Sequence, residues 1–172
     1  ISIMKIVENL DAGPIIKKIK IKIDKSFTAE KISKNLAKIS SESIIEILDN
    51  IFNKKSQFIE QNHKFATYAK KIKKNEAEIN WNNSAKKILA KINGLNPSPG
   101  AWFKYKEKRY KIWRATTNEM KGFPGTILDK NFIVACGDKS LEFIEIQKEG
   151  KNKLLLKNFL TGVKFKQGDM LK

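Results

Sequence analysis

The sequence has few of the residues on which several classes of protein depend. Among its 172 residues there is one cysteine, Cys136, which excludes a disulfide framework and a zinc site with several cysteine ligands. The one histidine, His63, has no second ligand near it in the sequence, so no metal site is expected. No apolar run approaches the ~20 residues of a membrane-spanning helix, and no membrane partner is expected. A lone thiol suits a reducing compartment, which favours a cytoplasmic location.

Acidic residues are also few beside the basic ones. The sequence has 18 Asp and Glu residues and 35 Lys and Arg residues, which give a formal net charge of +17. Such an excess indicates a polyanionic partner, nucleic acid before any other. Arg109 and Arg114 are the only arginines, and lysine, isoleucine and asparagine share A/T-rich codons. A generic solvated lysine surface is therefore the alternative.

The first third of the chain has the pattern of an α/β unit. Two strands are expected within residues 1–23 around a turn at 11–14, the second one alternating Ile and Lys from Lys17 to Ile23. Apolar spacing predicts one helix after Thr28 and another after Ser40 and Ser41, both facing a core. Because a strand at the very start needs neighbours, we expect the rest of its sheet upstream.

The rest of the chain has two further parts, a polar and basic segment and then a helix followed by short strands. Residues 54–82 are polar and basic and read as a linker, and a helix is predicted over 83–93, ended by Gly94. Short strands between Gly and Pro turns are then expected, as in a small closed barrel of the OB type spanning 83–172. They are placed at 101–106, 109–115, 125–128, 132–136, 141–147 and 151–156.

Few residues suggest chemistry by spacing alone. Asp11 lies in LDAGPI, where an Asp before Gly is ordinary turn chemistry and a catalytic carboxylate is the alternative. His63 is expected to be an exposed linker residue. Cys136, within the apolar VAC, is expected to be a buried and inert thiol.

Two basic clusters are more informative. In both, lysines and arginines could follow phosphates while aromatic rings stack on bases; the alternative has the rings inside the barrel and the lysines merely solvated. The first cluster, next to Tyr68, is Lys70, Lys71, Lys73 and Lys74. The second interleaves Tyr105, Tyr110 and Trp113 with Lys104, Lys106, Lys108, Arg109, Lys111 and Arg114.

Several motifs follow one another in a fixed order along almost the whole chain, and in that order they resemble the later part of the methionyl-tRNA formyltransferase family. Individually each motif is weak, whereas together they are specific. They are SIMKIVENLDAGPI (2–15), ATYAKKI (66–72), EAEINW (76–81), NPSPGAWF (96–103), KIWRA (111–115), PGTIL (124–128), VACGDKSLEFIEIQKEGK (134–151) and NFLTG (158–162). Asn93 and Ser98 depart from the family, which often has Arg and Trp there.

The resemblance implies a fold and an activity. Residues 1–53 would be the end of a Rossmann-like formyl-transfer domain, 54–82 a basic linker, and 83–172 an OB-like barrel that binds tRNA. The family transfers a formyl group from 10-formyltetrahydrofolate to the α-amine of methionyl-initiator tRNA in translation initiation, and its catalytic aspartate falls on Asp11. The asparagine and histidine that work with it lie in a segment absent here, and His63 does not match that histidine. We therefore expect a monomeric chain that is inactive alone; a stand-alone, non-catalytic RNA-binding module is the alternative.

Overall fold

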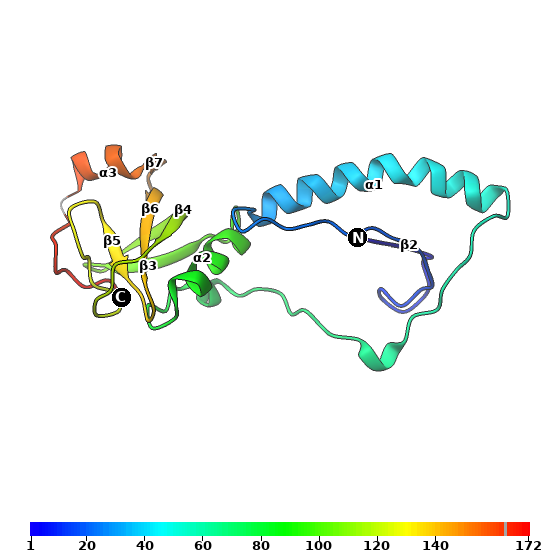
Figure 1. Ribbon diagram of the computed structural model, residues 1–172, viewed down its shortest axis with the longest axis horizontal. Coiled ribbons are helices and arrows are strands. Elements are labelled where there is room, and N and C mark those ends of the chain that lie inside the picture. The colour runs from blue at the N-terminus through cyan, green and yellow to red at the C-terminus, as the bar shows by residue number, and fades with distance from the viewer. Residues whose placement is uncertain (164) are drawn as a thin grey trace. The chain divides into compact units, whose positions relative to one another are not determined.

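The computed structural model describes residues 1–163 and 165–172. The chain forms two compact units. The first unit contains residues 1–24 and 31–71, and the second unit contains residues 25–30 and 72–172. Figure 1 shows the helices and strands of both.

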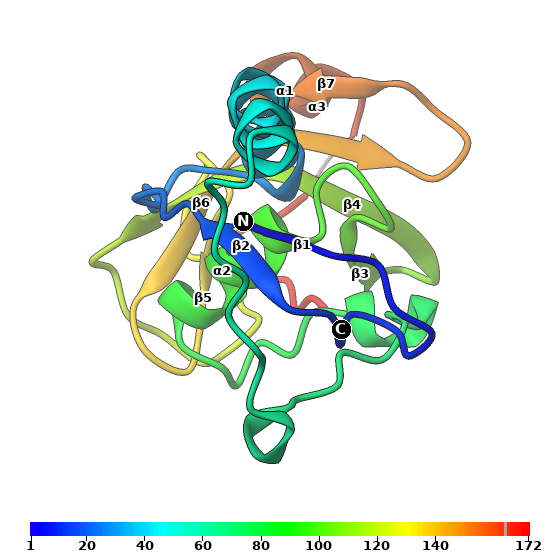
Figure 2. The same ribbon diagram turned by 90° about the vertical axis from the view of Figure 1, so that its right-hand side faces the viewer.

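A short antiparallel pair of strands begins the first unit. Strand β1 (Ser2–Met4) pairs with β2 (Ile15–Lys18), and the two lie side by side in Figure 2. The predicted strand up to Ile23 was too long. The Ile19 amide still donates to the carbonyl of Ile1 at 2.9 Å, but residues 19–24 form no regular strand.

Helix α1 (Ala29–Phe52) is continuous where the sequence predicted two helices. Ser40 and Ser41, taken as the break, donate their hydroxyls to carbonyls of the preceding turn, Leu36 and Lys38, at 2.8 Å each. Serine can bond back in this way without ending a helix. The predicted core-facing role of the second half was wrong as well. In that half only Ile47 is buried, while the large apolar side chains Ile44, Ile45, Leu48, Ile51 and Phe52 are exposed.

The polar stretch after α1 contains ordered backbone contacts. Ile59 and Ile15 exchange two backbone hydrogen bonds of 2.8 and 2.9 Å, so this stretch lies beside β2. Two short 3₁₀ turns follow, η1 (His63–Phe65) in the first unit and η2 (Lys74–Ala77) in the second. The boundaries of the predicted linker, 54–82, stay a prediction.

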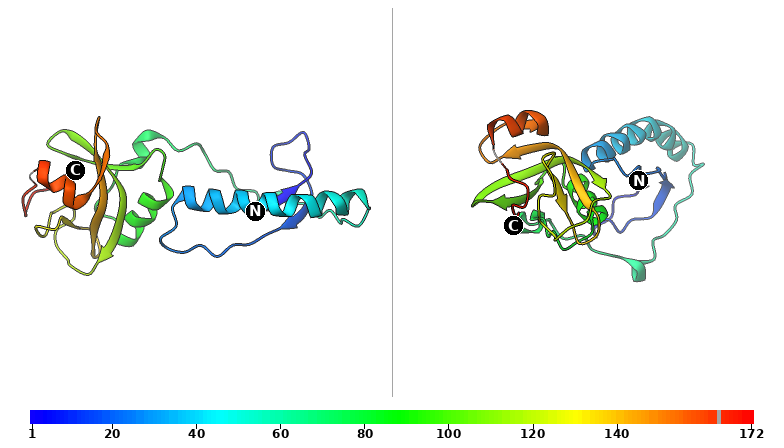
Figure 3. Two further views of the ribbon diagram at one scale, coloured as in Figure 1. Left: turned by 90° about the horizontal axis from the view of Figure 1, so that it is seen from above. Right: turned by 60° about the vertical axis from the view of Figure 1, so that its left-hand side comes forward.

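Helix α2 (Ala85–Gly94) follows η2 in the second unit. The Ser84 hydroxyl caps it by accepting from the Lys87 amide, as expected for a serine at this position. Gly94, predicted just beyond the helix, is its last residue, and Leu95 caps the end. Ile88 and Ile92 bury the apolar face, and the helix lies beside the sheet in Figure 3.

An antiparallel sheet forms the body of the second unit. Its strands are β3 (Ala101–Tyr105), β4 (Lys108–Asn118), β5 (Ile133–Ala135), β6 (Ser140–Lys148) and β7 (Lys153–Leu155). The order is β3-β4-β6-β5, and β7 also pairs with β6. Lys106 and Glu107, both with positive φ, make the tight turn between β3 and β4. A helix that the sequence did not predict, α3 (Leu156–Gly162), follows β7 directly.

Backbone hydrogen bonds continue from β5 round to β3. The predicted strand at 125–128 is seen only as isolated bridges, Ile127 with Val134 and Thr126 with Met170. At the end of the chain, Lys172 and Lys104 exchange two backbone hydrogen bonds of 2.6 and 2.9 Å. The sheet is therefore curled, with segments 125–127 and 168–172 hydrogen-bonded between its two outer strands.

Aromatic rings fill the interior of this unit. Phe103 is fully buried between Trp81, Tyr110 and Phe143, with ring centroids 5.5–5.9 Å from its own. Phe132 extends the same core to Phe143 at 5.1 Å. Such ring pairs contribute beyond the area they bury. No helix in the described part of the chain is long and apolar enough to cross a membrane.

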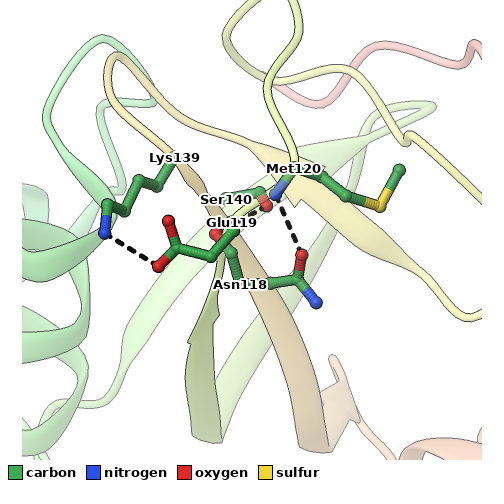
Figure 4. Close-up of polar contacts among 5 residues, drawn as sticks. All are labelled: Asn118, Glu119, Met120, Lys139 and Ser140. Atoms are coloured by element: carbon green, nitrogen blue, oxygen red, sulfur yellow. Dashed lines mark hydrogen bonds and ion pairs between the residues drawn. The ribbon is translucent and has the colours of Figure 1, made fainter.

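Side-chain contacts join the end of β4 to the start of β6 and the turn before it. The buried Ser140 hydroxyl donates to the Asn118 carbonyl at 3.1 Å, and Lys139 forms an ion pair with Glu119 at 2.8 Å (Figure 4). The Asn118 side chain in turn accepts from the Met120 amide at 3.0 Å. These contacts fix the register where β4 and β6 separate.

Candidate functional site

Asp11 lies in the turn between β1 and β2, where the sequence placed it. Its φ of 54° is left-handed, a conformation that Asp tolerates better than most residues, and the residue is exposed. It lines an open cavity of about 1170 Å³ in the first unit. A carboxylate held there at a solvent-accessible wall is able to exchange a proton with a bound substrate.

The backbone of this turn is held from two sides. On one side the Lys5 amide donates to the Pro14 carbonyl at 3.0 Å, and a Cβ at Gly13 would lie 1.8 Å from the Lys5 carbonyl oxygen. Only glycine fits there. On the other side the Gln61 amide nitrogen donates to the carbonyls of Asp11 and Gly13 at 2.9 and 2.7 Å. Sequence reasoning missed Gln61, since nothing in the polar stretch distinguishes it.

His63 lines the same cavity as Asp11. It begins turn η1, where the Asn62 side chain accepts from the Lys64 amide at 3.1 Å. The rim also carries exposed apolar and aromatic side chains from Leu10, Phe65 and Tyr68. In the described part of the chain, no group of three or more His, Cys, Asp or Glu side chains could hold a metal ion.

The second candidate site is the outer face of β3 and β4 in the second unit. Strand register pairs Lys104 with Arg109 and Trp102 with Lys111, and Trp113, at a register shift in β4, lies against Lys111. The Arg109 guanidinium lies over the Trp102 ring at 4.4 Å, and the Lys111 ammonium over the Trp113 ring at 5.5 Å. We name these five residues the basic–aromatic face.

The rings of the second cluster divide between the core and this face. Tyr105 and Tyr110 are buried, so for them the alternative of inward-pointing rings is confirmed. Trp113 is half-buried, and its indole donates to the Gln147 side chain at 2.9 Å. Trp102 is mostly buried by its neighbours, and its indole donates to the Lys74 carbonyl at 3.1 Å.

The remaining basic residues lie around or away from the basic–aromatic face. Lys74, and Lys73 before it, belong to the second unit and run beside β3 through the Trp102 contact, whereas Lys70 and Lys71 belong to the first unit. Lys106 lies in the β3–β4 turn, where a hydrogen bond with Tyr105 raises its pKa. Lys108 begins β4 on the opposite side of the strand to Arg109, and Arg114 follows a register shift opposite Glu145.

The lone cysteine has no part in either site. Cys136 is buried beside β5, as the apolar VAC predicted, and desolvation raises its pKa to about 12. A thiol with so high a pKa carries almost no thiolate at neutral pH and is a poor nucleophile or ligand.

Comparison with known proteins fits this architecture. The family described as "Formyl transferase, C-terminal domain" matches residues 71–164, over half of the chain. The chain belongs to this family. The methionyl-tRNA formyltransferase of Pelagibacter ubique is 45% identical over 172 residues, which are 99% of this chain and 56% of that protein. The chain therefore spans about half the length of such curated formyltransferases.

Solved structures of formyltransferases and of a more distant protein share the fold. The methionyl-tRNA formyltransferase from Clostridium thermocellum is 26% identical with a TM-score of 0.57, covering 72% of this chain and 52% of its own. HypX from Aquifex aeolicus gives a TM-score of 0.71 at 20% identity, over 99% of this chain and 34% of that one. A structure of HypX in complex with tetrahydrofolic acid gives 0.67.

Proposed function

We propose that this chain is part of a methionyl-tRNA formyltransferase. The full enzyme would transfer a formyl group from 10-formyltetrahydrofolate to the α-amine of methionyl-initiator tRNA, in the cytoplasm, at translation initiation. The observation that carries the proposal is the 45% identity to the Pelagibacter ubique enzyme across 99% of this chain. The folate is supported by the tetrahydrofolic acid bound to the more distant HypX.

Asp11 is the proposed catalytic residue. An amine that attacks the formyl carbon must lose a proton, and a carboxylate at an exposed cavity wall can accept it. The carbonyl oxygen gains negative charge at the same time and needs hydrogen-bond donors, each worth roughly 10² to 10³ in rate. The family resemblance assigns those donors to an asparagine and a histidine outside these 172 residues. We therefore expect the isolated chain to be inactive.

The basic–aromatic face is the proposed tRNA contact, within a second unit that we interpret as an OB-like barrel. Support for the barrel is the run of backbone hydrogen bonds from β5 through segments 125–127 and 168–172 to β3. Support for RNA is the gathering of Lys104, Arg109 and Lys111 around two tryptophans on one outer face. The same face would serve the second candidate function, a non-catalytic RNA-binding module, which needs no Asp11.

A chimeric enzyme tests the catalytic proposal. In it, this chain replaces the matching segment of the Pelagibacter ubique methionyl-tRNA formyltransferase, and formylation of methionyl-tRNA is measured. We expect the chimera to be active and Asp11→Asn to lower kcat by roughly 10²- to 10⁴-fold. Asp49→Asn, the same change at an exposed residue of α1, is the matched control. A folded but inactive chimera contradicts the proposed family role, and full activity of Asp11→Asn contradicts the assignment of Asp11.

A further inference from the structure

We infer that Gln61 is a positioning residue for Asp11, fixing the turn from which the carboxylate acts. The inference rests on the proposed function and adds to it a residue that no motif identifies. Gln61 lies 50 positions after Asp11, yet both belong to the first unit. Its side chain contacts the backbone of the turn and leaves the carboxylate free to meet the substrate.

The geometry is that of a clamp on two carbonyls. One side-chain nitrogen of Gln61 lies 2.9 Å from the Asp11 carbonyl oxygen and 2.7 Å from that of Gly13. An amide nitrogen has two N–H donors, and its two shortest contacts lie on the two sides of Ala12, while the Met4 sulfur is farther away at 3.7 Å. The carbonyls of Asp11 and Gly13 are thereby held in one orientation, and with them the left-handed backbone of Asp11.

The segment that carries Gln61 is itself held by backbone hydrogen bonds. Two residues before it, Ile59 pairs with Ile15 through two backbone hydrogen bonds, which place the segment alongside β2. Gly13 is closely packed as well, since the Lys5 carbonyl lies where its Cβ would be. The clamp therefore joins two anchored backbones, and the Asp11 turn between them has little freedom.

Such a clamp matters more for rate than for affinity. A catalytic group misplaced by about 1 Å can cost on the order of 10² in rate, because the geometry of attack is lost. Loss of the Gln61 donors would free the turn and leave two carbonyls without these partners. The Asp11 carboxylate would still be present, but it would occupy a wider range of positions.

The test uses the chimeric enzyme described above with two substitutions. Gln61→Ala removes the clamp, and Gln61→Glu keeps its shape but replaces the donor nitrogen with oxygen. We expect both to lower kcat by roughly 10- to 100-fold with the KM for methionyl-tRNA unchanged. Gln57→Ala, the same truncation at an exposed residue of the same segment, is the control and should retain full kcat. In the 172-residue chain itself, amide hydrogen exchange over residues 9–15 should become faster in both variants.

The outcomes separate this inference from the proposed function. Full kcat in both Gln61 variants, with Asp11→Asn inactive, overturns the positioning role and leaves the catalytic assignment intact. A loss of kcat that accompanies a lower thermal unfolding midpoint, without faster exchange at 9–15, also overturns it, because Gln61 would then act on overall stability. If Asp11→Asn is fully active, the catalytic assignment of Asp11 in the proposed function is wrong, and Gln61 then has no catalytic carboxylate to position.

Discussion

The two units bury their apolar residues to very different degrees. In the second unit one continuous cluster runs from Ala77 to Leu171 and includes Phe103, Phe132 and Phe143. In the first unit, among the described residues, the buried hydrophobic side chains are Ile15 and Ile47. Since hydrophobic burial is the main favourable contribution to folding, the second unit has a core of its own and the first has very little of one.

The difference indicates that the main stabilising core and the proposed catalytic residue lie in different units. The proposed catalytic Asp11 belongs to the thinly packed unit, where its turn depends on individual hydrogen bonds from Lys5 and Gln61. The basic–aromatic face belongs to the densely packed unit, where strand register fixes it. Substitutions around the Asp11 turn should therefore change the structure locally, whereas substitutions in the core of the second unit should change the stability of that whole unit.

Truncation of a core ring should show the largest effect of that kind. Phe103→Ala removes a fully buried side chain from the aromatic cluster, and we expect the free energy of unfolding to fall by about 3–5 kcal/mol. Leu48→Ala, on the exposed side of α1, should change it by no more than about 0.5 kcal/mol. Urea unfolding followed by tryptophan fluorescence measures the effect of Phe103→Ala, because Trp81, Trp102 and Trp113 all lie in the second unit.

Far-UV circular dichroism is the companion measurement, since it also detects α1. If the two units unfold separately, the circular dichroism and fluorescence transitions will differ in the wild-type chain. A destabilisation by Leu48→Ala as large as that by Phe103→Ala would contradict the comparison, because it would mean that the α1 face is packed.

Prediction from sequence succeeded where a local pattern had one physical meaning. The helix predicted over 83–93 is α2, and the short strands predicted between Gly and Pro turns at 101–106, 109–115 and 141–147 are β3, β4 and β6 within a few residues. Ser40 and Ser41 misled because serine hydroxyls can either interrupt a helix or bond back along it, and only the structure shows which occurs.

Long-range contacts explain most of what the sequence could not predict. The segment at 125–128 looked like a strand but pairs only through isolated bridges, partly to Met170, more than forty residues away. The place of Asp11 in a turn was predicted from its neighbours in LDAGPI, whereas its catalytic role stays a prediction. Gln61 was not found, since its role comes from a contact made across 50 residues.

Removal of charge from the basic–aromatic face should show an intermediate effect. Each of Arg109→Ala and Lys111→Ala should weaken tRNA binding by the 172-residue chain and reduce the slope of log affinity against log salt by about 1. Lys157→Ala, at an exposed residue of α3, is the control and should leave the slope unchanged. Binding isotherms between 50 and 200 mM salt give these slopes. Unchanged slopes for both face variants, with lower slopes for Lys70→Ala and Lys71→Ala, would assign RNA binding to the first unit instead.

Loss of the Asp169 charge in acid should produce the smallest effect. The Tyr105 hydroxyl donates to the Asp169 carboxylate, and this bond, followed by that from the Lys166 amide, lowers the pKa of Asp169 from its ordinary 3.8. A carboxyl whose pKa is lower in the folded state stabilises the fold above pH 3.8, and that contribution is lost as the pH falls through the lower folded value. Asp169→Asn should therefore reduce the urea midpoint slightly at pH 7 and by less at pH 3, because the wild-type carboxyl is progressively protonated as the pH falls below 3.8 towards the lower pKa of the folded state. Equal differences at both pH values would show that the Asp169 charge contributes nothing, and that the hydrogen-bond geometry alone holds segment 168–172 against β3.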